Sequence, residues 1–281
     1  MDSGLPQSAL QIVPMDTKYI DSVYTDERVK MISFTGSAEV GWIIKAKAHK
    51  KMVTLELGGN APVIVDESAD FEHSLKQTTT GAFAYSGQVC ISVQRVFIHD
   101  KIFDRWTEKF VENARRLKKG NPLEEETELS AMIDEKAAEK AQQWVTEAAA
   151  NGAEILCGNT RDKAMLEATV VTKTNPEMRV AAEEIFAPVA VVEKFADFRE
   201  AVDLANNTKY GLQAGVFTNN LANMRYASDY LEYGGVIIND VPAFRVDNMP
   251  YGGVKDSGFG REGVRYAMEE MSEIRLIVVN S

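Results

Sequence analysis

Two residues near the middle of the chain have side chains that could do chemistry, and the first is a cysteine. Cys90 lies in FAYSGQVCIS, residues 83–92, a stretch broken by a glycine that carries both apolar and hydroxyl side chains. As a thiolate it would be a nucleophile. Free cysteine is also among the most buried residue types, so the residue type alone favours a packed position in the core.

The second residue is Glu56, which follows Leu55 and precedes Leu57-Gly58-Gly59 in a run that otherwise has the pattern of a buried strand. A carboxylate in such a run must be paired, protonated or facing a cavity. Loss of hydration would raise its pKa toward the range of a general base at neutral pH. A glutamate at a strand end that points to solvent explains the pattern equally well.

A third candidate is the turn FTGS, residues 34–37, between an expected strand and an expected helix. Gly36 and Ser37 there would present backbone N–H groups and the positive end of the helix dipole, which suits a phosphate. Taken alone, the turn is better explained as a simple helix cap, because Ser is a good N-cap residue.

The composition restricts the function classes. Hydrophobic residues make up 45% of the 281 residues and charged residues 26%, as in soluble proteins, and no apolar run reaches a bilayer span, so no membrane partner is expected. A formal charge of −11 without a basic block argues against nucleic acid. Only two cysteines and the absence of a secretory signal pattern at the first residues favour a reducing, cytoplasmic location. The three histidines are scattered, so no metal site is expected.

The elements that must position these residues alternate between helix and strand, which predicts an α/β fold with largely parallel sheets. The length exceeds that of one comfortable core and predicts one large lobe and one partial lobe. Strands are expected at 30–34, 53–57, 62–65, 189–195, 213–218 and 235–239. Helices are expected at 38–48, from a cap at Asp70 to about 86, from a cap at Asp100, at 134–151, and from about 197 and 220.

Four motifs, in the order in which they occur along the chain, resemble those of a known family. Glu56 stands in LELGGNAP, Cys90 follows 34 positions later in SGQVCISVQR, Glu184 lies in EEIFAPV, and MPYGGVKDSGFGREG lies near the C-terminus. Together they resemble the aldehyde dehydrogenase superfamily over essentially the whole chain. The resemblance implies a three-layer α/β catalytic domain at 57–256, a partial Rossmann-like remnant of the dinucleotide-binding domain at 1–56, and a C-terminal segment with an oligomerisation strand at 257–281.

The resemblance also implies roles for individual residues. Cys90 would attack an aldehyde to form a thiohemiacetal, which is oxidised by NAD or NADP to a thioester, and Glu56 would activate the water that hydrolyses it. Glu262 would support this proton route. The residues expected to bind the cofactor are Gly36 and Ser37 at the pyrophosphate, Glu184 at the nicotinamide-side ribose, Phe186 near the nicotinamide, and Leu57. Cys157 is expected to be structural.

The sequence also departs from the family pattern. Members of the family carry a long N-terminal region with an asparagine that donates to the oxyanion and a lysine at the adenosine ribose, and these 281 residues lack its match. The chain is therefore expected to be a truncated, weakly active or inactive form. The parent enzyme is expected to be a homo-oligomer, a dimer or a tetramer. A cofactor-independent thiol esterase and a non-catalytic fold remnant stay open as alternatives.

The substrate is expected to be a small aldehyde. Val89 before the cysteine lacks the charge that a phosphate there would need, and Arg245 in PAFRVDNMP is the nearest candidate for an anion contact. Small aldehydes that carry a hydroxyl or an acidic group are therefore favoured. The choice between NAD and NADP is left open, because the residues that read the 2′ position lie outside these motifs.

Overall fold

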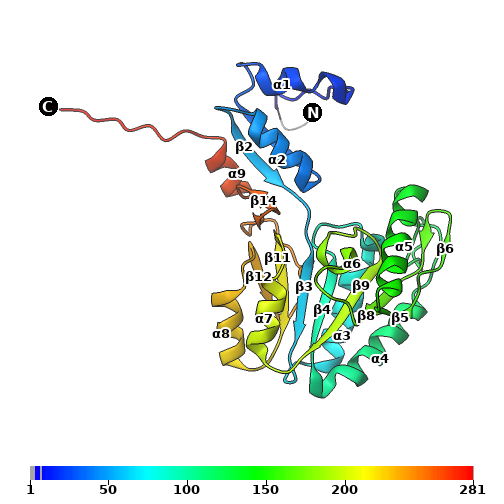
Figure 1. Cartoon of the computed structure of the whole chain (residues 1–281). Coiled ribbons are helices and arrows are strands. Elements are labelled where there is room, and N and C mark those ends of the chain that lie inside the picture. Colours follow the sequence, from blue (N-terminus) through cyan, green and yellow to red (C-terminus); the bar gives the residue numbers. More distant parts are fainter. Residues whose placement is uncertain (1–3, 7, 281) are drawn as a thin grey trace.

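The larger part of the protein is built on a seven-stranded sheet. The computed structural model describes residues 4–6 and 8–280 (Figure 1). The strands lie in the order β12-β11-β3-β4-β9-β8-β5, and all neighbours are parallel except the antiparallel pair of β5 and β8. Their bounds are β3 Ala61–Val65, β4 Val93–His99, β5 Glu154–Cys157, β8 Thr169–Thr172, β9 Val189–Phe195, β11 Gln213–Phe217 and β12 Gly235–Ile238.

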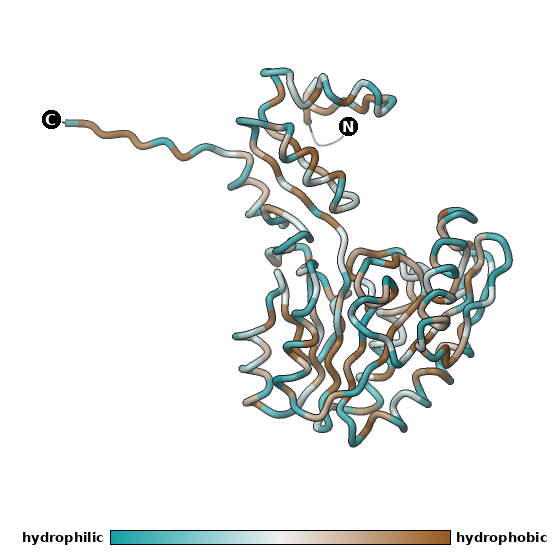
Figure 2. Tube along the Cα trace, in the orientation of Figure 1, coloured by the Kyte–Doolittle hydropathy of each residue, from teal (hydrophilic) through white to brown (hydrophobic). Residues whose placement is uncertain are grey.

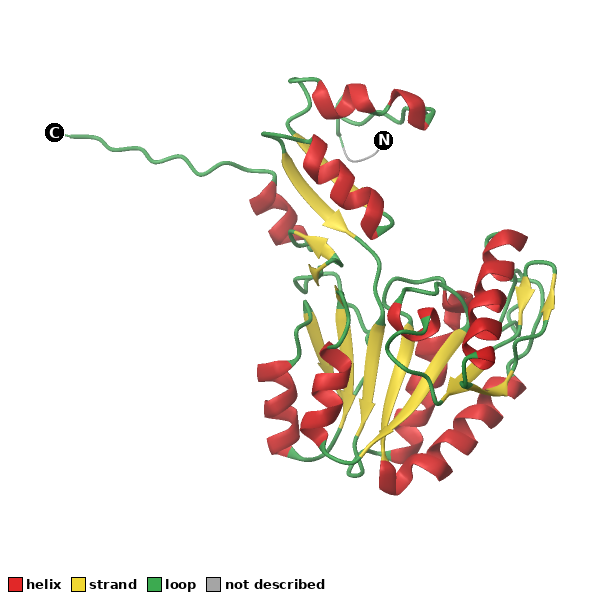
Figure 3. Ribbon diagram, viewed as in Figure 1, coloured by secondary structure: helices red, strands yellow, loops and turns green. Residues whose placement is uncertain are grey.

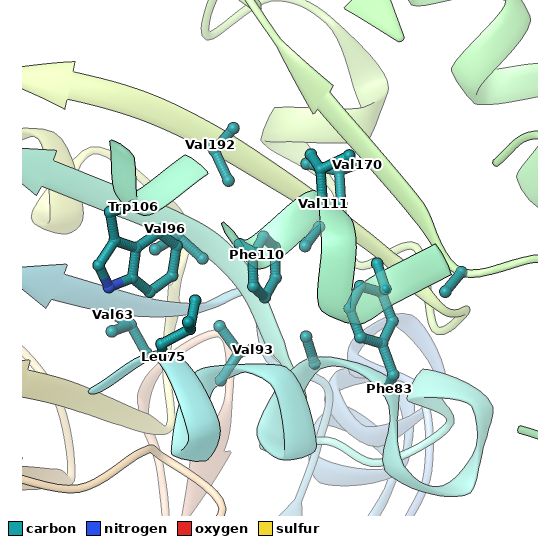
Figure 4. Packing of buried hydrophobic residues seen from close by; sticks show 14 of the residues in the cluster. Val63, Leu75, Phe83, Val93, Val96, Trp106, Phe110, Val111, Val170 and Val192 are labelled. Carbon is teal, nitrogen blue, oxygen red and sulfur yellow. The ribbon is translucent and has the colours of Figure 1, made fainter. Parts of the chain in front are cut away.

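Helices cover both faces of this sheet, so the part has three layers (Figure 3). On β3, Val63 and Val65 join one core while Ile64 joins the other, as the alternation of side chains along a strand requires. The first core lies under helices α3 (Phe71–Phe83) and α4 (Asp100–Arg116), and includes the buried rings of Trp106 and Phe110 (Figure 4). The opposite face is covered by α5 (Glu135–Ala150), α7 (Phe198–Asn206) and α8 (Leu221–Tyr230).

A smaller three-stranded sheet stands beside the large one (Figure 1). Strand β1 (Met31–Thr35) pairs in parallel with β2 (Met52–Glu56), and β14 (Gly258–Phe259) pairs with β2 in antiparallel register. The other elements of this part are η1 (Thr17–Tyr19), α1 (Asp21–Thr25), α2 (Ala38–Lys47) and α9 (Val264–Glu270). The chain passes from β2 into β3 through four residues, so β2 and β3 join the two sheets.

Short elements complete the fold. A pair of two-residue strands, β10 (Tyr210–Gly211) and β13 (Val254–Lys255), brings the C-terminal part back to the large sheet. The remaining short elements are η2 (Ala84–Gly87), β6 (Arg161–Asp162), β7 (Met165–Leu166) and α6 (Arg179–Ala182). None of the helices in the described ranges is long and apolar enough to cross a membrane.

The α/β fold predicted from the sequence is confirmed. Strands β4 and β8 were not among the expected strands, and two further differences concern helix ends. Helix α3 ends at Phe83 rather than near residue 86, because Tyr85 and Ser86 adopt left-handed backbone angles with φ of 52° and 55°. Asp100 is not the N-cap of α4; the ring of His99 caps it by accepting from the backbone N–H of Lys101.

Candidate functional site

Three of the predicted residues, Glu56, Cys90 and Glu184, lie at the connection between β2 and β3. The glycines of this connection let other segments of the chain approach it closely. A Cβ on Gly58 would lie 2.3 Å from Glu184 Oε2, and a Cβ on Gly59 would lie 2.2 Å from the backbone oxygen of Cys90. Both distances are far shorter than a carbon atom tolerates. Glycine is therefore required at both positions to bring Glu184 and Cys90 against this connection.

Cys90 lies between α3 and β4, in a tight stretch that begins at the left-handed residues Tyr85 and Ser86. Gly87 is also left-handed, and a Cβ there would lie 2.0 Å from the backbone oxygen of Ala187. The thiol is half-buried, and its Sγ lies 3.3 Å from the hydroxyl oxygen of Tyr251. Burial raises the pKa of the Cys90 thiol, and the hydrogen bond with Tyr251 opposes that rise.

Tyr251 was not among the residues predicted from the sequence. It stands directly before Gly252-Gly253 in the C-terminal motif, and only this position beside a glycine pair could have drawn attention to it. The contact joins residues 161 positions apart, which no local pattern can reveal. The side chain is buried, and burial raises the pKa of its phenol well above the ordinary value.

Glu56 occupies the last position of β2 with its side chain 6% exposed. Neither carboxylate oxygen has a hydrogen-bond partner among the described residues. Burial, and next the negative charge of Glu262, raise the pKa of Glu56 to about 8, while Arg245 and Arg261 act in the opposite direction. A carboxyl group with such a pKa is largely protonated at neutral pH and becomes a base as the pH rises.

Glu184 and Phe186 line a small pocket together with Gly59 and Val89. Glu184 Oε1 accepts a 2.8 Å hydrogen bond from the backbone N–H of Gly59, and burial raises the pKa of this carboxyl group. Phe186 adopts a left-handed backbone with φ of 53°, and the residue is 43% exposed. An exposed phenylalanine beside a carboxylate is a surface that a flat heterocycle and a sugar diol could occupy.

Leu57 differs from this pair, because its side chain is buried in the core under α2. A Cβ on Gly41 would lie 2.3 Å from Leu57 Cδ2, so the helix packs directly on the leucine. The side chain of Leu57 is therefore not available to a ligand, and only its backbone could contribute to binding.

The turn at Gly36 and Ser37 lies at the same end of the small sheet as Glu56. The backbone N–H of Gly36 donates to the backbone oxygen of Glu56 at 3.1 Å, so it is already satisfied. Ser37 caps α2, where its hydroxyl oxygen accepts from the backbone N–H of Val40 at 3.4 Å. The Ser37 hydroxyl keeps its own proton available, whereas Gly36 supplies shape and no free donor.

Glu262 and Arg245 form an ion pair at the edge of the site, with 2.8 Å between Arg245 Nη2 and Glu262 Oε2. The guanidinium of Arg245 also lies over the ring of Tyr251, 4.2 Å from its centroid. Cys157 is buried far along the large sheet, near the backbone oxygen of Ala168, and lies outside this group. Among residues 4–6 and 8–280, no cluster of three or more His, Cys, Asp or Glu side chains could hold a metal ion.

Comparisons with known proteins agree with one another. Residues 1–277 match the model of the aldehyde dehydrogenase family. The 3-sulfolactaldehyde dehydrogenase of Priestia megaterium is 42% identical over 280 residues, which cover 99% of this chain and 59% of that protein. The lactaldehyde dehydrogenase of Methanococcus aeolicus is 44% identical, over 93% of this chain and 56% of that protein.

Two solved structures have the same fold. Aldehyde dehydrogenase 21 from Physcomitrella patens, in complex with the reaction product succinate, has a TM-score of 0.90 and 47% identity, over 92% of this chain and 54% of that one. The glyceraldehyde-3-phosphate dehydrogenase GapN from Methanocaldococcus jannaschii, complexed with NADP, has a TM-score of 0.90 and 43% identity, over 93% of this chain and 57% of that one.

This chain thus spans less than three fifths of the length of these relatives. Within that span the family match is nearly complete, and the resemblance drawn from the four motifs is confirmed. The chain belongs to the aldehyde dehydrogenase family.

Proposed function

We propose that these residues form the catalytic part of an NAD(P)-dependent enzyme that oxidises a small aldehyde to a carboxylic acid. The observation that carries the proposal is the convergence of Cys90, Glu56 and Glu184 on the connection between β2 and β3. The half-buried thiol supplies a nucleophile, the buried carboxyl group supplies a base, and the Glu184 pocket supplies a place for a sugar diol. The relatives named above are all aldehyde dehydrogenases, which supports this assignment.

The residues present fit a nicotinamide dinucleotide. The absence of a Cβ at Gly58 leaves Glu184 Oε2 uncovered while Gly59 holds Oε1, so one carboxylate oxygen is positioned to accept from ribose hydroxyls. Phe186 and the backbone of Leu57 would flank the nicotinamide, and Ser37, with Gly36 shaping the turn, would meet the pyrophosphate. When bound, the cofactor supplies the hydride acceptor that turns the Cys90 adduct into a thioester.

The chain's own residues would carry the other steps. The Cys90 thiolate attacks the carbonyl carbon, so a carbon–sulfur bond forms and the carbonyl π electrons move to oxygen. After oxidation, ionised Glu56 takes a proton from water as the water oxygen attacks the thioester carbon. The carbon–sulfur bond then breaks, the acid leaves, and the thiolate is restored. Glu262 supports this stage through its charge, which holds the pKa of Glu56 high.

For the substrate, we propose a small aldehyde with a hydroxyl or an acidic group. Arg245 lies over the ring of Tyr251, whose hydroxyl contacts the reacting sulfur, so one tyrosine side chain links a guanidinium to the nucleophile. The names of relatives support the same class, since sulfolactaldehyde and lactaldehyde carry these groups. Succinic semialdehyde, which carries a carboxylate, and a neutral aldehyde of equal chain length form the matched pair of substrates that tests this class.

The same proposal includes a domain division at residues 1–56, 57–256 and 257–281. It also includes a homo-oligomeric assembly and a reducing cytoplasmic location. Both cysteines are free thiols, which agrees with a reducing compartment. Because these residues cover 59% of the length of the Priestia relative, we also propose that the 281 residues alone oxidise aldehydes weakly. Formation of NADH from a short aldehyde by the purified chain is the direct measurement.

The thiol chemistry can be tested without the cofactor. p-Nitrophenyl acetate should acetylate Cys90 with release of p-nitrophenol, and Glu56 should promote hydrolysis of the acetyl thioester. In Glu56→Gln the acetyl group should accumulate on the Cys90 peptide, and in Cys90→Ser it should be absent, as judged by mass spectrometry. Cys157→Ser is the matched control and should behave like the parent chain. Acetylation of Cys157 in place of Cys90 would refute the nucleophile assignment.

The same assay separates the proposal from the thiol-esterase alternative. Two results together would favour the esterase. Ester hydrolysis would be complete and fast without NAD, and no aldehyde would give NADH even with a polypeptide extended to the length of the relatives. A Cys90 that reacts no faster than a model thiol would favour a non-catalytic remnant.

A further inference from the structure

Tyr251 has a contact that the proposed mechanism does not yet use. Its hydroxyl oxygen lies 3.3 Å from Cys90 Sγ, which is hydrogen-bonding distance for an oxygen and a sulfur. Within the described part of the chain, no other side chain is recorded within hydrogen-bonding distance of that sulfur. A phenol that touches the nucleophilic atom can change its charge state as well as its position.

The structure holds this hydroxyl in place from several sides. The backbone of Tyr251 forms two hydrogen bonds with that of Glu262, at 3.1 and 2.6 Å. Its ring packs in a small cluster with Ile91 and Leu212, and the guanidinium of Arg245 covers the ring. The side chain is 4% exposed, so it has little room to turn away from Cys90.

The charges around Cys90 disfavour a thiolate. Burial raises the pKa of the thiol most, and the negative charges of Glu184 and, where it is ionised, of Glu56 raise it further. Arg245 is paired with Glu262 and lies on the ring of Tyr251 rather than at the sulfur.

The tyrosine is the group that offsets this repulsion. Burial and the neighbouring thiol raise the pKa of the Tyr251 phenol, so it keeps its proton and can only donate to an anionic sulfur. A hydrogen bond to an ionised group is stronger than one between neutral groups. Among the described side chains, the hydroxyl of Tyr251 is therefore the donor available to the thiolate.

We propose that Tyr251 is a catalytic residue whose hydroxyl donates a hydrogen bond to the Cys90 thiolate and so holds the nucleophile in its reactive form. The inference rests on the proposed function, because it assumes that Cys90 is the nucleophile. No covalent bond to the tyrosine forms: the thiol proton leaves to water, and the phenol keeps its own. Phenylalanine at this position would fill the same space without the donor.

The test compares the pH dependence of Cys90 reactivity in the parent chain and in Tyr251→Phe. The probe is 4,4′-dithiodipyridine, a neutral disulfide, with peptide mapping to separate Cys90 from Cys157. Loss of the donor should raise the midpoint of the rate profile by about one pH unit. A thiolate of higher pKa is also the better nucleophile, so the variant should react roughly threefold more slowly at neutral pH and roughly threefold faster above both midpoints.

This crossing of the two profiles is specific to the hydrogen bond. A merely structural change would raise or lower the rate at every pH alike. Tyr233→Phe is the matched control, because it removes a buried hydroxyl that donates to the backbone oxygen of Ala205, away from Cys90, and should leave the profile unchanged. Circular dichroism checks that each variant is folded. If Tyr251→Phe does not fold, difluorotyrosine at position 251, a stronger donor, should lower the midpoint instead.

The outcomes distinguish the two proposals. Crossed profiles with selective labelling of Cys90 support the role of Tyr251. Selective labelling of Cys90 with superimposed or parallel profiles overturns that role and leaves the nucleophile assignment standing. Faster labelling of Cys157 than of Cys90 in the parent chain overturns both.

Discussion

At the scale of single residues, the most informative feature is the buried carboxyl group of Glu56. Its oxygens lack hydrogen-bond partners in the described part of the chain, so the fold buries a polar group without satisfying it. Such an arrangement lowers stability, and it is typical of a group held ready for proton transfer. The adjacent Gly252, whose Cβ would lie 3.0 Å from Glu56 Oε1, keeps that oxygen approachable.

The raised pKa of Glu56 predicts how stability depends on pH. The folded pKa of about 8 exceeds the ordinary value of 4.5 for a glutamate, so folding favours the protonated form. Stability is therefore full below about pH 4.5, falls by at most about 1.4 kcal/mol per pH unit up to about pH 8, and is constant above it. Glu56→Gln removes this loss. The free energy of unfolding of the variant, relative to that of the parent chain, should therefore increase by a few kcal/mol between pH 5 and pH 8.

Urea unfolding at several pH values measures this difference. Glu273→Gln, on the exposed C-terminal tail, controls for the loss of one carboxylate. A constant difference between Glu56→Gln and the parent chain across that range would show that the carboxyl group is not strained by burial.

Cys90 and Glu56 stand out in the sequence as a thiol and a carboxylate within apolar stretches, but their residue types alone favour a packed cysteine and leave Glu56 undecided. The roles expected of both, and of Glu184, come from the resemblance to the family. The burial that the pattern around Glu56 suggested is what the structure has. Tyr251 could not be predicted in the same way, since aromatic residues are common in cores and its significance lies in a contact across 161 positions. The exclusion of the Leu57 side chain likewise depends on how α2 packs, which periodicity does not show.

At the scale of elements, Arg95 connects β4 to its neighbours from a fully buried position. Its guanidinium donates to the backbone oxygens of Asn60, Leu204 and Ala205 and to the hydroxyl of Tyr233. These acceptors belong to the start of β3, the end of α7 and the approach to β12. Burial lowers the pKa of this guanidinium, and the ring of acceptors holds the charge in place.

Replacing Arg95 should therefore loosen several elements at once. Arg95→Met keeps much of the volume but leaves buried carbonyl oxygens without a donor, which predicts a loss of about 2 kcal/mol or more in the free energy of unfolding. Arg225→Met is the control, since Arg225 forms only an exposed pair with Asp229 on α8 and should change stability by less than about 0.5 kcal/mol. Chemical unfolding followed by circular dichroism compares the two; equal effects would contradict the role given to Arg95.

Most element positions were predictable, because capping residues and periodicity are local. Asp134 caps α5 and Asp197 caps α7, near the predicted starts. The end of α3 was not predictable from periodicity, since no local pattern marks the left-handed turn at Tyr85 and Ser86, where the Ser86 hydroxyl donates to the backbone oxygen of Ser130. Helix α2 has the expected bounds, but Val40 and Ile43 on its apolar face are more than 40% exposed.

At the scale of the whole molecule, the candidate site lies where the two sheets meet, and apolar surface gathers on the smaller part. The last described residues, 273–280, form an extended tail without regular secondary structure that points away from the rest of the protein (Figure 1). Coloured by hydropathy, this tail shows apolar segments (Figure 2). The exposed side chains of this tail include Ile274, Leu276, Ile277, Val278 and Val279. Strand β1 is also an edge strand in the small sheet.

An extended apolar tail and an unpaired strand edge favour association between chains, because each offers hydrogen-bonding groups and apolar surface that water solvates poorly. We therefore expect the chain to associate in a concentration-dependent way, and removal of residues 272–281 to reduce that association while leaving the unfolding midpoint of the large sheet nearly unchanged. Sedimentation at several concentrations measures the first effect and urea unfolding the second. The matched control replaces Leu123, an exposed side chain outside both surfaces, with serine. If removal of the tail leaves association unchanged, the exposed apolar face of α2 or the edge of β1 must provide the contact.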